Sequence, residues 1–306
     1  MNYKGKKGAD VSSNNGNIDF EKIKKAGFDF VMIRCGYGSD IETQDDTQFQ
    51  ANVKKAEKAG MPWGTYLYSY ACDDKAARSE VEHIARLLKG KKPLFPVALD
   101  IEDSDGYHER HGAWNKKTID SVAKIFIHGM KELKYYPALY VGFEEVVNLI
   151  NRDTLKGVDI WWAQWWKVCE IPDYLTLGMW QYGGEVNYLE SNSIDGVGVI
   201  DKNFSYKDYP TIIKNGGFNG WDKPEQKTLD KFGFTKGNAS DGILALKALI
   251  IAAKQKGVIS QGVDMNNIFG DGTEKAVNQF LIANGYKPTG VAGQNFIKLL
   301  CDQLKI

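Results

Sequence analysis

The sequence is poor in the residues from which metal sites and disulfide frameworks are built. Its 306 residues include only four histidines and four cysteines, the latter at positions 35, 72, 169 and 301. The cysteines lie far apart and form no C-x-x-C pair, which argues against a zinc site and against a disulfide-stapled fold. Such cysteine usage is typical of a chain made in a reducing cytosol.

Other absences exclude further classes of protein. The chain has 39 basic and 39 acidic residues, so nothing favours a nucleic-acid partner. No apolar run is long enough to span a membrane, so no membrane partner is expected. The lysines near the N-terminus are not followed by the apolar segment of a secretory signal, so we expect a chain made in the cytoplasm. No G-x-G-x-x-G motif follows the first predicted strand, so no dinucleotide cofactor is expected.

Aromatic residues, in contrast, are abundant, with 8 Trp, 15 Tyr and 14 Phe. Packing in the core is the ordinary explanation. The alternative is a cleft whose flat rings contact the apolar faces of sugars.

One stretch, Phe95–Gly106, has the pattern of a buried strand that ends in acid. Alternate side chains of a strand share a face, so Val97, Leu99 and Ile101 lie on one side. Ala98, Asp100 and Glu102 lie on the other side. Taken alone, the two acids are also consistent with salt bridges at an exposed strand end.

Strands alternate with helices over about the first 205 residues, which indicates parallel β/α units. About eight strands are expected, with few helices in the last third. This number favours an α/β fold of the TIM-like kind, an irregular, flattened β/α barrel, with an open doubly wound sheet as the alternative. In such barrels functional residues lie at the carboxyl ends of strands.

Four acids fall at these predicted strand ends: Asp10, Asp100, Glu102 and Asp201. Only Arg34 lies in a nearby strand as a counter-ion. A cluster of carboxyl groups suits hydrolysis of a glycosidic bond, in which one group stays protonated and another is ionised. We predict that Glu102, with its longer side chain, is the acid and that Asp100 tunes it. Binding of Mg²⁺ or Ca²⁺ is the competing chemistry, but no metal is our expectation.

The rest of the chain predicts a second, smaller domain. We assign residues 1–209 to the barrel, the Gly- and Asn-rich residues 210–226 to a linker, and residues 227–306 to an all-α domain of three helices. The Asp264–Asn267 turn faintly resembles a calcium loop, but its twelfth position is Lys275 instead of Glu.

The chain resembles the glycoside hydrolase family 25 lysozymes. The resemblance covers about residues 6–207 and is carried by Asp10-Val11-Ser12, Asp100-Ile101-Glu102, Trp180-Gln181-Tyr182 and Val199-Ile200-Asp201. It implies cleavage of the β-1,4 bond between N-acetylmuramic acid and N-acetylglucosamine, with Glu102 as general acid. By the same resemblance, Asp10, Asp100 and Asp201 would be the assisting carboxyl groups. The substrate-binding candidates are Arg34, Tyr66, Tyr68, Tyr140, Trp165 and Gln181.

The sequence departs from the family's pattern at two positions. Leu67 replaces a histidine, and Asp201-Lys202-Asn203 replaces Asp-Leu-Asn. The second departure makes Asp195 a rival to Asp201. We prefer Asp201, because Val199-Ile200 supplies a strand that it would end.

The C-terminal segments Phe269–Phe280 and Thr289–Gly293 resemble peptidoglycan-binding domains of type 1. Together with the barrel, they imply a bacteriophage endolysin that binds and lyses the cell wall, with a homo-oligomer formed through the C-terminal domain as a further expectation. A bacterial autolysin, a non-catalytic wall-binding protein on an inactive barrel, and a glycosidase of another class such as a chitinase are the alternatives.

Overall fold

The structure is a computed structural model that describes residues 2–223 and 227–306. The chain divides into two compact units, residues 1–223 and 224–306. Each unit has its own hydrophobic core. Within the described residues, every helix is too short or too polar to cross a membrane.

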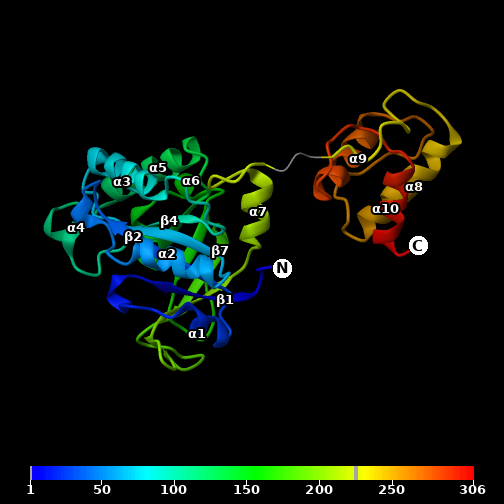
Figure 1. Cartoon of the computed structure of the whole chain (residues 1–306). Helices are drawn as coiled ribbons and strands as arrows, with labels where there is room; N and C mark the ends of the chain where they lie inside the picture. Colours follow the sequence, from blue (N-terminus) through cyan, green and yellow to red (C-terminus); the bar gives the residue numbers. More distant parts are fainter. Residues whose placement is uncertain (1, 224–226) are drawn as a thin grey trace. The chain divides into compact units, whose positions relative to one another are not determined.

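The first unit is a closed barrel of eight strands, as the sequence predicts (Figure 1). Seven strands are parallel to their neighbours in chain order: β1 (Lys6–Val11), β2 (Phe30–Tyr37), β3 (Trp63–Tyr68), β4 (Val97–Asp100), β5 (Pro137–Val141), β6 (Asp159–Ala163) and β7 (Thr176–Gly183). The eighth, β10 (Asp201–Ser205), closes the barrel between β7 and β1 and is antiparallel to both.

The direction of β10 corrects the prediction that Asp201 ends a strand. The β7–β10 connection holds the short hairpin β8 (Ser193–Ile194) and β9 (Gly198–Val199) instead of a crossover helix. Without a crossover the chain returns in the opposite direction. Asp201 therefore begins β10 and faces Asp10 across the β1–β10 pair. It still reaches the rim formed by the carboxyl ends of the other strands.

Helices cover the outside of the barrel. They are α1 (Phe20–Lys25), α2 (Phe49–Lys58), α3 (Asp74–Leu88), α4 (Tyr107–Arg110), α5 (Lys116–Glu132) and α6 (Arg152–Leu155), with 3₁₀ turns η1 (Ser13–Asn15) and η2 (Glu42–Gln44) and a π-helical turn η3 (Glu145–Leu149). The long helices begin at capping side chains: Asp73 accepts from the Ala76 N–H, and Asn115 from the Thr118 N–H. Figure 1 shows α3 and α5 side by side, in agreement with their contacts.

The alternation predicted for β4 is confirmed. Val97 and Leu99 belong to the core between strands and helices, whereas Ala98 belongs to a second cluster inside the barrel. In that inner cluster Phe30 and Phe95 stack with ring centroids 4.2 Å apart. Apolar packing inside the barrel leaves the acidic rim as its polar end.

The linker prediction for residues 210–226 is wrong for residues 210–223, and residues 224–226 lie outside the described part of the chain. Helix α7 (Tyr209–Gly216) buries Tyr209 and Ile213 in the inner cluster. The buried amide of Asn219 donates to the carbonyl oxygens of Pro93 (3.2 Å) and Phe95 (3.0 Å). The Gly- and Asn-rich composition therefore marks a segment that packs on the barrel.

The second unit has the three predicted helices, α8 (Asp241–Gln255), α9 (Asp271–Ala283) and α10 (Gln294–Leu304). Phe280 and Phe296 pack edge to face at its centre, with centroids 5.1 Å apart. The turn that resembles a calcium loop binds a lysine instead. The buried Lys247 ammonium donates to Asp264 Oδ1 (2.8 Å) and to Asn266 Oδ1 (2.7 Å).

Candidate active site

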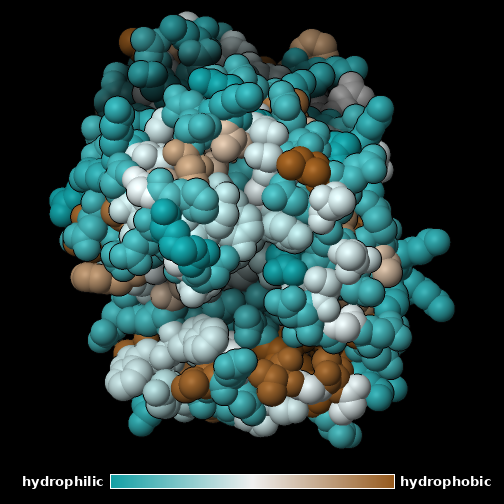
Figure 2. Space-filling model, turned by 90° about the vertical axis from the view of Figure 1, so that its left-hand side faces the viewer, coloured by the Kyte–Doolittle hydropathy of each residue, from teal (hydrophilic) through white to brown (hydrophobic). Residues whose placement is uncertain are grey.

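A cavity of about 280 Å³ opens at the carboxyl-terminal end of the barrel. Figure 2 views the side of the molecule that carries α4, and this face is hollowed near its centre with apolar side chains along its lower edge. The cavity is lined by Asp10, Ser12, Asn14, Asn15, Arg34, Tyr66, Tyr68, Asp100, Glu102, Ser104, Tyr140, Trp161, Gln181 and Asp201. A larger cavity lies between α5 and η3. The smaller one is the candidate active site because it contains four carboxyl groups.

The structure brings together every predicted site residue except one in this cavity. The exception, Trp165, is absent from the lining but donates its indole N–H to Gln181 Oε1 (2.8 Å). The rival acid, Asp195, is exposed in the turn between β8 and β9. Arg34 lines the cavity, but its ion pair is with Asp46, at 2.9 Å, and it also donates to Ser13 Oγ (3.0 Å). The one counter-ion expected near the four acids is thus paired with another carboxylate, although its charge still lowers the pKa of Asp100.

Asp10, on β1, is held by two side-chain amides. Gln181 Nε2 donates to Asp10 Oδ2 at 3.0 Å, and Asn203 Nδ2 donates to the same oxygen at 2.8 Å. Burial raises the pKa of Asp10 to about 6, and the two amides oppose that rise. Asp10 is thus the acid in this cavity that two side-chain amides bind, and both amides favour its ionised form.

Aromatic donors fix the orientation of both amides. The Tyr140 hydroxyl and the Trp165 indole each donate to Gln181 Oε1 at 2.8 Å. The Trp161 indole donates to Asn203 Oδ1 at 2.7 Å. Because each amide oxygen is already occupied, each NH₂ group must point at Asp10. Tyr140, Trp161 and Trp165 therefore act on Asp10 indirectly, through Gln181 and Asn203.

Asp100 and Glu102 stand in a different environment. Burial raises the pKa of Asp100 well above its ordinary value, and the nearby charges of Glu102 and Asp10 add to the rise. Glu102 is half-buried, and burial raises its pKa also, while a hydrogen bond from Ser104 Oγ to Glu102 Oε1 (3.1 Å) opposes this. Burial and the facing charge of Asp10 raise the pKa of Asp201 to about 8. The site thus combines one acid held by two side-chain amides, Asp10, with three acids whose pKa values are raised and that have no amide donor.

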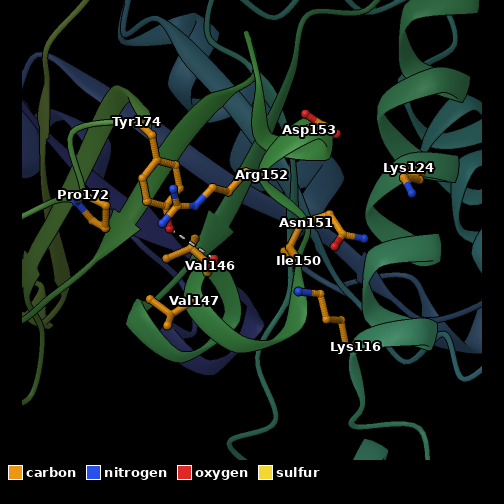
Figure 3. A pocket seen from close by; sticks show the side chains of 10 residues that line it. All are labelled: Lys116, Lys124, Val146, Val147, Ile150, Asn151, Arg152, Asp153, Pro172 and Tyr174. Atoms are coloured by element: carbon orange, nitrogen blue, oxygen red, sulfur yellow. Dashed lines mark hydrogen bonds between the residues drawn. The ribbon is translucent and has the colours of Figure 1, made fainter.

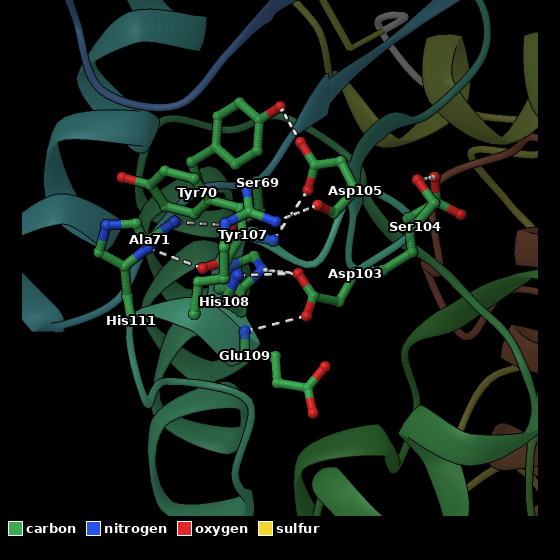
Figure 4. Close-up of polar contacts among 12 residues, drawn as sticks. Ser69, Tyr70, Ala71, Asp103, Ser104, Asp105, Tyr107, His108, Glu109 and His111 are labelled. Carbon is green, nitrogen blue, oxygen red and sulfur yellow. Dashed lines mark hydrogen bonds and ion pairs between the residues drawn. The ribbon is translucent and has the colours of Figure 1, made fainter.

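The loop that follows Glu102 is fixed by its own polar contacts (Figure 4). Asp103 accepts from the backbone N–H groups of His108 (2.8 Å) and Glu109 (2.9 Å) at the start of α4. The Tyr70 hydroxyl donates to Asp105 Oδ2 at 2.6 Å. These contacts hold the residues between Glu102 and α4, so that Ser104 stays within reach of the Glu102 carboxyl group.

Sequence reasoning missed several residues of the site. Ser12, Asn14 and Asn15 form a capped turn directly after Asp10, in which Ser12 Oγ accepts from the Asn14 N–H and Asn15 Oδ1 from the Ser12 N–H. Their place after a rim acid was a usable signal. The position of Trp161 on an inner face was readable from strand alternation. The role of Asn203 could not be predicted from the sequence, because it depends on a contact with Asp10 across the antiparallel β1–β10 pair.

Across residues 2–223 and 227–306, no group of three or more His, Cys, Asp or Glu side chains is arranged to hold a metal ion. Of the four acids, Asp10 contacts two side-chain amides and Glu102 a hydroxyl group.

Comparison with known proteins gives a family match over the barrel. A model described as glycosyl hydrolases family 25 matches residues 9–190. The autolytic lysozyme of Clostridium acetobutylicum is 31% identical over 96 residues, which cover 31% of this chain and 28% of that protein. The aligned part is thus a little over a quarter of the relative's length.

Two solved structures extend the likeness in fold. The CTP1L endolysin superposes with a TM-score of 0.59 at 17% identity and covers 98% of this chain and 99% of its own. The modular autolysin LytC from Streptococcus pneumoniae, in complex with a synthetic peptidoglycan ligand, superposes with a TM-score of 0.54 at 23% identity, over 65% of this chain and 46% of its own. At these identities the likeness concerns the fold.

Proposed function

The chain belongs to glycosyl hydrolase family 25, and from this premise we propose that it hydrolyses peptidoglycan at the β-1,4 bond between N-acetylmuramic acid and N-acetylglucosamine. The named relatives, an autolytic lysozyme and an autolysin bound to a peptidoglycan ligand, support this substrate. The site supports it independently, because glycosidic hydrolysis needs one protonated and one ionised carboxyl group.

Glu102 is the proton donor in this mechanism. Burial favours its protonated form, and its position after β4 places it in the cavity. Ser104 Oγ donates to Oε1, so the proton of Glu102 resides on Oε2, the oxygen without that donor. From Oε2 it is transferred to the oxygen of the leaving sugar as the glycosidic bond breaks.

Asp10 is the carboxylate that stabilises the positive charge developing on the sugar ring. Its two amide donors keep Oδ2 occupied, which leaves Oδ1 free to face the reacting carbon or the water that attacks it. Burial raises the pKa of Asp100 and raises that of Asp201 to about 8, and in their protonated forms both can donate hydrogen bonds without adding negative charge. Their neutrality protects the ionised state of Asp10, since like charges at close range disfavour each other.

The observation that carries the proposal is the pair of oriented amides on Asp10 in the same cavity as Glu102. Its test is the Glu102→Gln variant on purified cell walls, with release of reducing ends as the readout. We expect a loss of at least about 100-fold, the usual contribution of a general acid. Glu109→Gln, an exposed glutamate of α4, is the matched control and should retain full activity. Undiminished activity of Glu102→Gln would show that another group donates the proton.

We assign the second unit to cell-wall binding and the whole chain to an endolysin. The support is the CTP1L endolysin, because its match covers 98% of this chain and 99% of the endolysin. The alternative, a bacterial autolysin, is supported by the clostridial relative. Lysis of the source cells only after a phage is induced would favour the endolysin, and lysis of uninfected cells would favour the autolysin.

A further inference from the structure

A second cavity, of about 520 Å³, lies on the outer wall of the barrel (Figure 3). Helix α5 contributes Lys116 and Lys124 on one side, and α6 contributes Arg152 on the other. Asp153 is the one acidic side chain in the lining. Lys124 is engaged with Asp120 at 2.7 Å, whereas no ion pair found among the described residues includes Lys116 or Arg152. The cavity therefore presents two cationic groups that have no acidic partner in the described part of the chain.

The Arg152 side chain is held flat by an aromatic ring. Its guanidinium carbon lies 4.3 Å from the centroid of the Tyr174 ring, and the Tyr174 hydroxyl donates to the Val146 carbonyl oxygen at 3.3 Å. Stacking on the ring occupies the face of the guanidinium and leaves its N–H edge available. A planar fork of N–H donors matches a carboxylate better than a spherical anion. Val147, which is exposed, and Pro172, which is half-buried, add apolar surface suited to small aliphatic groups.

The π-helical turn η3 forms part of the wall of this cavity and also affects the charge state of the active site. The charge of its first residue, Glu145, contributes to the raised pKa of Glu102, and the Glu145 carboxylate accepts from the Gly142 N–H at 2.8 Å. The next residue, Val146, together with Val147, lines the outer cavity. One turn of chain thus lines the outer cavity and acts through its charge on Glu102.

We propose that the cavity formed by Lys116, Arg152 and Tyr174 binds a carboxylate of the short peptide that peptidoglycan carries on its muramic acid residues. The proposal rests on the proposed function for the identity of the glycan, and it adds recognition of the peptide branch. The alanine methyl groups of such a peptide match the apolar part of the lining, and its carboxylates match the two cations.

The first test compares two glycans. Peptidoglycan fragments with their peptides are compared with the same fragments after an amidase has removed the peptides, using the Lys116→Gln/Arg152→Gln double variant. We expect KM for the peptide-bearing glycan to rise about fivefold, with kcat unchanged, because two exposed charge contacts are lost. Cleavage of the stripped glycan should be unaffected. Lys117→Gln, on the same helix but outside the cavity lining, is the matched control.

The second test measures binding without catalysis. The tripeptide L-alanyl-γ-D-glutamyl-L-lysine is titrated into the full-length protein carrying Glu102→Gln, and perturbed NMR signals are mapped. We expect perturbations at Arg152 and Tyr174 that the double variant abolishes. The proposal would be overturned if the double variant lost the same activity on both glycans or no activity on either. Binding of inorganic phosphate in place of the tripeptide would overturn it as well. If the wild-type protein cleaved neither glycan, the proposed function would fail, and the tripeptide titration would still decide this one.

Discussion

The hydrogen bond from Ser104 to Glu102 sets the pH at which the enzyme loses its proton donor. The Ser104 hydroxyl donates to Glu102 Oε1 at 3.1 Å and lies 3.1 Å from the Tyr68 hydroxyl. Because it favours the ionised carboxylate, it holds the pKa of Glu102 below the value that burial alone would give. Ser104→Ala removes this donor, so Glu102 stays protonated to higher pH.

The magnitude follows from the exposure of the bond. A typical hydrogen bond contributes about 0.5–1.5 kcal/mol, and the exposed position of Ser104 places it near the lower end, at about 0.7 kcal/mol. One pH unit corresponds to about 1.4 kcal/mol, so the alkaline limb of the kcat/KM profile should move upward by about half a unit. Soluble peptidoglycan fragments are the substrate, and rates are measured from about pH 4 to pH 9.

Ser104→Thr keeps a hydroxyl group at the same position and serves as the control. Its alkaline limb should coincide with that of the wild type. A limb that stays in place in Ser104→Ala, or moves to lower pH, would refute the assignment of Ser104 as a donor to the catalytic acid. A fall in kcat at every pH, with an unchanged profile, would refute it also, since that result indicates a structural role.

Three further predictions concern stability and domain function. Burial raises the pKa of Glu80 from 4.5 to about 8, so the folded state binds an extra proton between these pH values and its stability falls as pH rises through them. In urea denaturation, the free energy of unfolding of Glu80→Gln should therefore gain on that of the wild type by about 1.4 kcal/mol per pH unit over this range. A difference that stays constant with pH would contradict this prediction. The buried Asp159 carboxylate pairs with Lys207 and accepts hydrogen bonds from Tyr136 and Tyr209, so Asp159→Asn should lower the free energy of unfolding by about 3 kcal/mol. The control Asp173→Asn, at an exposed position, should leave it unchanged. Removal of the residues after Lys223 should abolish co-sedimentation with cell walls and leave cleavage of soluble fragments within about twofold, whereas retained sedimentation would remove the wall-binding role from the second unit.

Local patterns predicted much of the fold. The alternation in Val97–Asp100 correctly divided an outer apolar face from an inner face that ends in acid, because side-chain direction along a strand has a fixed period of two. The three C-terminal helices followed from equally local signals. The antiparallel direction of β10 was not predicted, because alternation along a strand is the same in either direction. The direction depends on the β7–β10 connection, which has no crossover helix.

The sequence predicted most residues of the site but not the hydrogen bonds that join them. Asp10, Glu102 and Gln181 lie in one cavity as expected. The hydrogen bonds that orient the two amides join residues at least 16 positions apart, and only the closed barrel brings those residues together. Likewise, the Gly- and Asn-rich composition of α7 and the following turn hid the buried contacts of Asn219, which depend on backbone carbonyl groups near residue 95.

The most direct test of the central claim is the chemistry of the new chain ends. Cell walls are digested with the wild-type protein, the products are reduced with borohydride, and the terminal sugars are identified by mass spectrometry. The account predicts reduced N-acetylmuramic acid at the new ends, and none of it above background with Glu102→Gln. Reduced N-acetylglucosamine at those ends, or muramic acid ends released equally by both proteins, would contradict it.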